Sequence, residues 1–274
     1  MEDLTLKLDN LNFTYPLSDK KATDNLSLEI KKGEKVAIIG RNGMGKSTLF
    51  FLANGVLKPD SGKIFLGNNE IKHSKDDLKL LRKSVGLVFQ DPDNQFVAPT
   101  VEEEISFGPL NLGYSQDETR EIVDDILRLL KIENLRSRST HSLSGGEKKI
   151  VSIGSVMALY PDFLIFDEPT AGLDNYNSKN LLKILDMLHD LGLGLIISTH
   201  EIDFAWEWSE KVIIIKDGKV AASGPTTEIL TDIDLLNENK LNIPYIVEFT
   251  NLLKETHDIK TYPKNMEELK KLLK

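Results

Sequence analysis

The sequence predicts an α/β fold built on a mainly parallel sheet whose strands are joined by helices. Three short apolar runs, at 163–166, 193–197 and 212–215, are typical of strands buried on both faces, and helical segments lie between them. A glycine-rich loop near residue 40 joins a further strand to a helix. Hydrophobic side chains make up 40% of the 274 residues, a proportion that excludes wholesale disorder and low-complexity chains.

The first part of the chain is expected to be rich in strands. Its alternating apolar patterns predict strands at 4–8, 11–15, 26–30 and 36–40, with a turn at 32–34 between the last two. Downstream of the glycine-rich loop, apolar residues continue at helical spacing until Gly55 and Pro59 end the helix. Two further strands are predicted at 61–67 and 84–90.

Capping signals place helices in the middle of the chain. Ser74, with Asp77 three residues later, predicts a helix start between those two strands. From 101 to 135 acids outnumber bases, and a capping box at Ser115 and Glu118 precedes apolar residues at helical spacing. This segment is expected to be a helical insert. The strand at 212–215 then forms a hairpin through a turn at 217–218, and helical pieces broken by prolines follow Thr231.

Composition excludes several classes of protein. A net charge of −9 and a pI near 5.2 have the wrong sign for a protein held broadly on nucleic acid by its phosphates. The absence of cysteine excludes disulfides, thiolate zinc sites and cysteine nucleophiles. The apolar runs are far shorter than the ~20 residues of a membrane-spanning helix. The start of the chain, MEDLTLKLDN, does not have the pattern of a signal peptide.

The segment GRNGMGKST at 40–48 matches the phosphate-binding loop pattern G-x-x-x-x-G-K-[ST], in the strand-to-helix context that this loop requires. Backbone N–H groups and the positive end of the helix would converge on phosphate oxygens, so the expected ligand is a nucleoside triphosphate. Lys46 would place its charge near the β- and γ-phosphates, and Ser47 would bind Mg²⁺. A dinucleotide fingerprint fails, because Thr48 stands where a third glycine is needed; a turn that binds nothing is the remaining alternative. The residues expected at the nucleotide are Gly40, Asn42, Gly43, Gly45, Lys46, Ser47 and Thr48.

Two adjacent carboxylates, Asp167 and Glu168, end the apolar strand at 163–166. Open α/β sheets bind their ligands at this end of the strands. Asp167 can hold Mg²⁺, and Glu168 can orient or deprotonate an attacking water. Strand-end acids in solvent are the simpler alternative, but together with the phosphate-binding loop the pair favours hydrolysis over binding alone.

The segment LSGGE at 143–147, together with the phosphate-binding loop and the acid pair, resembles the ATP-binding cassette (ABC) ATPases, and the motif order matches from about residue 4 to 231. The resemblance implies an α/β P-loop NTPase fold with a RecA-like core sheet, an N-terminal antiparallel β-subdomain, a helical subdomain and a small C-terminal extension. It implies an ATPase domain over 1–232, with the helical subdomain inserted at about 96–146, and an extension over 233–274. ATP and Mg²⁺ are the implied cofactors.

By resemblance, Ser144, Gly145 and Gly146 belong to the family signature, which meets the nucleotide held by a second ATPase subunit, and Asp174 lies in the D-loop. Ser144 also has a plain structural reading as a helix cap, with Glu147 completing a capping box. The signature usually ends in Gln and is followed three residues later by Arg, whereas this chain has Glu147 and Ile150. A carboxylate aimed at a triphosphate would repel it by a few kcal/mol at an effective dielectric constant of about 20, so Glu147 is expected to turn toward its own helix.

Three more residues receive roles from the resemblance. Gln90, in VFQDPDNQ, is the Q-loop residue, placed near Mg²⁺ and the reacting water. His200, in STHE, is the switch histidine, which could hydrogen-bond the γ-phosphate or the water. Tyr15 is the aromatic residue that stacks on adenine. A structural histidine and a tyrosine packed in a hairpin core are the respective alternatives.

The segment VFQDPDNQF and the C-terminal extension look like the energy-coupling factor group of importers, which take up cobalt, nickel or vitamins. The implied partners are a second ATPase subunit, in a homo- or heterodimer, a transmembrane coupling subunit and a substrate-binding membrane subunit; the implied location is the cytoplasmic face of the membrane. The acids Asp91, Asp93 and 102–104 would suit arginines on a partner, or form a solvated face. A soluble ABC ATPase not coupled to transport, and a regulatory module without turnover, are the alternatives.

Overall fold

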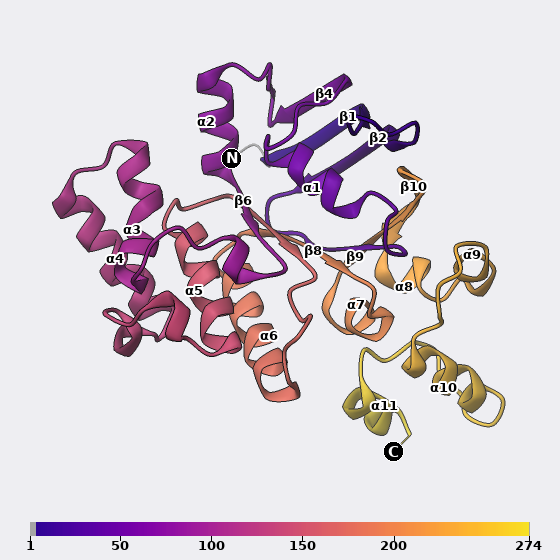
Figure 1. Ribbon diagram of the computed structural model, residues 1–274. Coiled ribbons are helices and arrows are strands. Elements are labelled where there is room, and N and C mark those ends of the chain that lie inside the picture. Colours follow the sequence, from indigo (N-terminus) through magenta and orange to yellow (C-terminus); the bar gives the residue numbers. More distant parts are fainter. Residues whose placement is uncertain (1–3, 274) are drawn as a thin grey trace.

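Two β-sheets form the centre of the computed structural model, which describes residues 4–273 (Figure 1). The larger sheet has the strand order β10-β9-β3-β8-β7-β6. Strands β3, β6, β7, β8 and β9 are parallel, as the sequence predicted, and β10 pairs with β9 as the expected antiparallel hairpin. The strands are β3 (Lys35–Ile39), β6 (Val85–Val88), β7 (Phe163–Asp167), β8 (Gly194–Thr199), β9 (Lys211–Lys216) and β10 (Lys219–Pro225).

The smaller sheet is antiparallel, with the order β2-β1-β4-β5. Its strands are β1 (Thr5–Thr14), β2 (Lys21–Lys31), β4 (Ser61–Leu66) and β5 (Asn69–Glu70). The prediction of two separate strands at 4–8 and 11–15 is wrong, because both segments belong to β1. The register shifts between Leu8 and Leu11, and Asn10 has a φ of 53°. Such a bulge reverses the alternation of side chains, so Leu6 and Leu8 before it and Leu11 and Phe13 after it all point into the core.

Helices surround the sheets, with α3 and α4 on one side of the molecule and α9 to α11 on the opposite side (Figure 1). The predicted helix starts at Ser74 and Ser115 are confirmed, since each forms a complete capping box. Among residues 4–273, no helix has the length and apolar character to cross a bilayer. The helices are α1 (Lys46–Ala53), α2 (Lys75–Ser84), α3 (Val101–Leu112), α4 (Gln116–Leu130), α5 (Gly145–Met157), α6 (Asn175–Asp190), α7 (Ile202–Trp208), α8 (Thr226–Ile229), α9 (Ile233–Glu238), α10 (Tyr245–Lys254) and α11 (Met266–Leu272).

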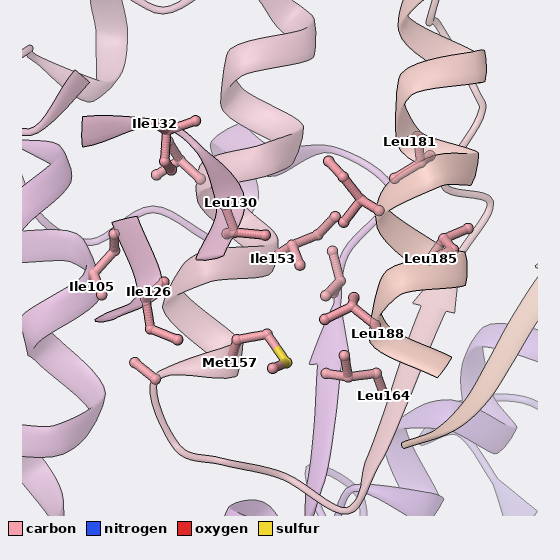
Figure 2. Close-up of a cluster of buried hydrophobic side chains, with 14 of the residues drawn as sticks. Ile105, Ile126, Leu130, Ile132, Ile153, Met157, Leu164, Leu181, Leu185 and Leu188 are labelled. Atoms are coloured by element: carbon pink, nitrogen blue, oxygen red, sulfur yellow. The ribbon is translucent and has the colours of Figure 1, made fainter. Parts of the chain in front are cut away.

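Three buried apolar clusters hold these elements together. One lies between the helical insert, α5 and α6, and fixes α5 against the large sheet; Figure 2 shows part of it. A second joins the small sheet to α1. In the third, the C-terminal helices pack on the large sheet and α7, and Trp206 Nε1 donates a hydrogen bond to the carbonyl oxygen of Pro263 at 3.0 Å. The residues labelled in Figure 2 are Ile105, Ile126, Leu130, Ile132, Ile153, Met157, Leu164, Leu181, Leu185 and Leu188.

Candidate nucleotide-binding site

The glycine-rich loop runs from the end of β3 into α1, as the sequence predicted. Gly45 precedes the first helical residue with a φ of 98°, and a Cβ atom there would lie 2.3 Å from the carbonyl oxygen of Ala22. Only glycine fits this position without strain. Unlike α2, α4 and α5, helix α1 has no side-chain cap, so no side chain at its N-cap accepts from the N–H groups of the first turn. Such a helix end attracts anions.

Lys46 is the first residue of α1, and its ammonium group folds back over the loop. Nζ donates hydrogen bonds to the carbonyl oxygens of Gly40 at 2.6 Å and Arg41 at 3.3 Å. Burial lowers the pKa of Lys46, while the negative charges of Glu168 and Asp167 act in the opposite direction. The loop therefore holds a cation beside two carboxylates.

A cavity of about 500 Å³ opens in front of the loop and brings together most of the predicted site. Gly40 contributes through its contact with Lys46, and His200 reaches the site through Glu168, as described below. Ser18, Lys20, Lys21 and Asp217 also line the cavity, and sequence reasoning did not single them out. The predicted residues that line it are Tyr15, Asn42, Gly43, Gly45, Lys46, Ser47, Thr48, Gln90, Asp167 and Glu168.

The two acids at the end of β7 are positioned by Ser198, a residue that the sequence analysis missed. Ser198 lies opposite Asp167 in the neighbouring strand β8 and is fully buried. Its hydroxyl donates to Asp167 Oδ1 at 2.5 Å and accepts from the backbone N–H of Glu168 at 2.9 Å. Glu168 itself has a φ of 42°, a left-handed conformation that is uncommon outside glycine and often found at functional sites.

The Glu168 carboxylate lies between two polar side chains from other elements. Gln90 Nε2 is 3.4 Å from Oε2, and His200 Nδ1 is 3.4 Å from Oε1. Both contacts are longer than ordinary hydrogen bonds, so they orient the carboxylate without saturating it. A carboxylate held in this way is able to accept a proton from a water molecule in the cavity.

Tyr15 stands at the rim of the same cavity. Its hydroxyl lies 3.1 Å from Thr48 Oγ1, and its ring meets that of Phe13 edge to face, with centroids 5.0 Å apart. The ring is partly exposed, which leaves aromatic surface available beside the loop.

The oxygen donors around the cavity fit Mg²⁺. Ser47, Gln90 and Asp167 supply hydroxyl, amide and carboxylate groups, the hard ligands that this ion prefers. Within residues 4–273, no cluster of three or more His, Cys, Asp or Glu side chains could hold a metal. A magnesium ion held by these groups would also bind water molecules and phosphate oxygens of a nucleotide.

The signature residues lie outside this cavity. Ser144 caps α5, and Gly145 lines a second cavity of about 420 Å³ that shares Gln90 with the first. Asp174 caps α6 by accepting from the N–H of Asn177 at 2.8 Å. Gly146 packs so closely against Asn177 that a Cβ atom would lie 2.3 Å from its Oδ1. Within one chain, the signature residues therefore lie outside the cavity that the phosphate-binding loop lines.

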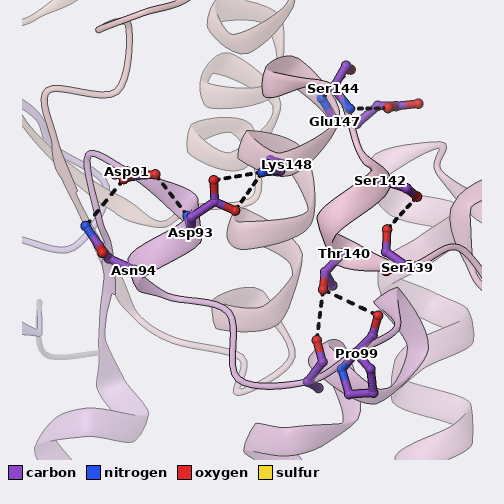
Figure 3. A network of polar contacts seen from close by, with 11 residues as sticks. Asp91, Asp93, Asn94, Pro99, Ser139, Thr140, Ser142, Ser144, Glu147 and Lys148 are labelled. Atoms are coloured by element: carbon purple, nitrogen blue, oxygen red, sulfur yellow. Dashed lines mark hydrogen bonds and ion pairs between the residues drawn. The ribbon is translucent and has the colours of Figure 1, made fainter.

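The expected orientation of Glu147 is confirmed (Figure 3). Glu147 Oε2 accepts from the N–H of Ser144 at 2.7 Å, and Oε1 accepts from Arg138 at 2.9 Å, an ion pair that the sequence did not suggest. These donors lower the pKa of the Glu147 carboxyl, chiefly through the backbone N–H of Ser144. The carboxylate is thereby turned onto its own helix.

Two acids that follow Gln90, Asp93 and Glu104, have partners within the chain. The expectation of a solvated or arginine-binding face is therefore wrong for Glu104. Only 3% of Glu104 is exposed, and its Oε2 accepts from the N–H groups of Val97 and Ala98, both at 2.9 Å. Burial raises the pKa of this carboxyl. Asp93 forms an ion pair with Lys148 (Figure 3).

Comparison with known proteins identifies the family. The model of the ABC transporter family matches residues 23–171. A putative ABC transporter ATP-binding protein of Methanothermobacter marburgensis is 40% identical over 97% of this chain and 96% of its own length. The energy-coupling factor transporter ATP-binding protein EcfA2 of Clostridium perfringens strain SM101 is 41% identical, over 93% and 90% respectively.

Solved structures agree with this result. The structure of CbiO1 from Clostridium perfringens, part of the ABC transporter complex CbiONQ, has a TM-score of 0.77 and 40% identity, and covers 91% of this chain and 100% of its own. A dimeric ATP-binding cassette in a post-hydrolysis state with ADP and Pi has a TM-score of 0.72 and 29% identity, covering 81% and 98%. The chain described here, with its P-loop, antiparallel N-terminal sheet, RecA-like sheet and helical subdomain, belongs to the ABC transporter ATPases.

Proposed function

We propose that this ABC ATPase powers an importer of the energy-coupling factor type and hydrolyses ATP in the cavity before α1. The observation that carries the catalytic part is the convergence of Lys46, Ser47, Gln90, Asp167 and Glu168 on one cavity. The similarity to EcfA2 and to CbiO1 supports the transporter type. Cobalt, nickel or a vitamin is the proposed class of solute.

Each side chain has a separate task in this proposal. Lys46 and the N-terminus of α1 bind the β- and γ-phosphates, and Tyr15 packs on the base. Glu168 accepts the proton of the attacking water, while Gln90 and His200 orient the water and the carboxylate. Ser47, Gln90 and Asp167 would hold Mg²⁺, which when bound neutralises charge on the phosphate oxygens.

A second ATPase subunit completes the site. Because Ser144, Gly145, Gly146 and Asp174 lie outside the chain's own nucleotide cavity, we infer that they face the nucleotide of the partner subunit. The capped N-terminus of α5 then meets the γ-phosphate from the opposite side. ATP binds the closed dimer better than the open one, so binding closes the dimer and hydrolysis reopens it. The dimer is either a homodimer or a heterodimer.

A groove of about 930 Å³ between α2, α3 and α5 is the proposed site of the transmembrane coupling subunit. Val156 of α5 and Leu159, just after the end of α5, line this groove. Val97 and Phe107 also line it and are 62% and 50% exposed, and exposed apolar side chains in one groove mark an interaction surface. An apolar helix of the coupling subunit would cover them.

In this proposal, the complex with the transmembrane coupling subunit holds the ATPase at the cytoplasmic face of the membrane. A substrate-binding membrane subunit completes the complex and selects the solute. Within the chain, residues 1–232 form the proposed ATPase domain, with the helical subdomain at about 96–146, and residues 233–274 form the extension.

Purification from membranes tests the importer assignment. The full chain, tagged and expressed in its own host, is expected to co-purify from detergent-solubilised membranes with an integral membrane protein. Phe107→Asp should remove that partner, because it places a charge in the groove. Leu110→Asp is the matched control, since Leu110 lies on the same helix and is exposed but does not line the groove. Recovery of the chain without any membrane protein would favour the soluble ATPase, and equal behaviour of the two variants would show that this groove does not bind the partner.

A further inference from the structure

Lys149 is a buried lysine of α5 that the proposed reaction does not use. Only 2% of the residue is exposed, and its Nζ donates hydrogen bonds to the carbonyl oxygens of Phe89 at 3.0 Å and Gln90 at 2.7 Å. A buried ammonium group is unfavourable unless polar partners replace its water. Burial accordingly lowers the pKa of Lys149 to about 8, against the attraction of Asp91 and Asp167. The two carbonyl groups are thus its main direct partners.

Two more contacts attach the segment 89–95, which contains Gln90, to α5, and a third contact lies within the segment. Gln95 Oε1 accepts from the N–H of Phe89 at 3.2 Å, which closes the segment 89–95 at its base. The Nε2 of Gln95 donates to the carbonyl oxygen of Ser152 at 2.7 Å. Lys148, next to Lys149, holds Asp93 at 2.6 Å (Figure 3). The segment is therefore fastened to α5 at both ends and in the middle.

We propose that Lys149 is a positioning residue that sets the place of Gln90 in the nucleotide cavity according to the position of α5. Its ammonium group holds the carbonyl of Gln90 itself, and the side chain of the same residue reaches Glu168 at 3.4 Å. A displacement of α5 consequently moves the Gln90 amide relative to the carboxylate. The inference rests on the proposed role of Gln90 at the reacting water.

This contact joins the two nucleotide sites of the proposed dimer. Helix α5 begins with Gly145 and Gly146, the glycines proposed to meet the nucleotide of the partner subunit. Lys149 lies about one turn further along the same helix. When the partner's γ-phosphate draws the start of α5 toward it, Lys149 carries the backbone of Gln90 along. Each subunit thereby adjusts its own water-binding side chain to the nucleotide in the other site.

A double-mutant cycle tests the inference with the full chain in its purified complex. Lys149→Met keeps an unbranched apolar side chain and removes the hydrogen-bond donors, and Gln90→Ala removes the amide that Lys149 is proposed to place. Lys149→Met is expected to lower kcat roughly tenfold or more, since small displacements of catalytic groups have effects of this size, and to leave the KM for ATP within about twofold. Lys149→Arg, which retains charge and donors, should keep more of kcat than Lys149→Met.

The cycle separates positioning from a structural role. If Lys149 acts through Gln90, Lys149→Met causes no further loss of kcat in the Gln90→Ala background. An equal loss in both backgrounds, a wild-type kcat for Lys149→Met, or equal losses for the Met and Arg variants would overturn the inference. A wild-type kcat for Gln90→Ala would instead overturn the proposed role of Gln90. Should Lys149→Met fail to fold, Lys149→Ala, which leaves room for water at the two carbonyls, takes its place in the same cycle.

Discussion

Ser198→Ala is the most informative single change near the two acids. The hydroxyl of Ser198 donates to Asp167 Oδ1 and accepts from the N–H of Glu168, and the residue is fully buried. Its loss leaves a carboxylate oxygen and a backbone N–H without these partners, and each such group costs about 1–3 kcal/mol. Because Glu168 is only partly buried, we expect the free energy of unfolding to fall by about 2–4 kcal/mol in total.

The same change is expected to lower the rate of ATP hydrolysis. Without Ser198, the left-handed backbone at Glu168 loses its hydrogen bond, and kcat should fall roughly tenfold. Urea denaturation followed by circular dichroism measures stability, and phosphate release measures kcat. Ser152→Ala is the matched control, because Ser152 is equally buried but its hydroxyl donates to the carbonyl oxygen of Lys149 within its own helix. Equal stability losses in the two variants, with kcat unchanged in both, would refute this account of Ser198.

Two further changes test the loop and the buried acid. Gly45→Ala should reduce ATP affinity in equilibrium binding and destabilise the fold by at least about 2 kcal/mol, because its Cβ would overlap the carbonyl oxygen of Ala22 in a left-handed conformation; unchanged affinity would contradict the geometry. Burial raises the pKa of Glu104 above 4.5, so the folded state binds more protons and stability falls as pH rises through that range. In urea titrations, Glu104→Gln should therefore gain stability relative to the wild type as the pH rises from 4 to 7. Glu104→Leu leaves the N–H groups of Val97 and Ala98 without an acceptor and should lose roughly 2–5 kcal/mol of unfolding free energy. A stability difference between Glu104→Gln and the wild type that does not vary with pH would show that the pKa of Glu104 is not raised by burial.

Local signals in the sequence predicted much of this architecture. The capping boxes at Ser74, Ser115 and Ser144 depend on residues three apart, and all three form as expected. The orientation of Glu147 followed from the same local geometry and a simple charge argument. The phosphate-binding loop was also predicted from the sequence, because its residues are contiguous and their pattern is specific to a strand-to-helix turn.

The features that the sequence did not predict depend on contacts between distant segments. Ser198 becomes important only because β8 pairs with β7 in the register that places it opposite Asp167. Nothing in the local sequence distinguishes Lys149, because the carbonyl oxygens of Phe89 and Gln90 that its ammonium group contacts come from a distant segment. The bulge in β1 changes the face of the sheet toward which the following side chains point. The alternation of apolar residues in the sequence is interrupted there, so one strand was predicted as two.

Glu168→Gln tests the central claim, that this cavity binds ATP and uses a carboxylate to activate water. The variant keeps the shape of the side chain and an oxygen that can accept hydrogen bonds, but it can no longer take up a proton. Equilibrium binding of ATP together with single-turnover phosphate release, measured on the same preparation, separates binding from chemistry. The account predicts ATP binding close to that of the wild type and phosphate release slowed by about 10²-fold or more. Phosphate release at the wild-type rate would show that Glu168 is not the base.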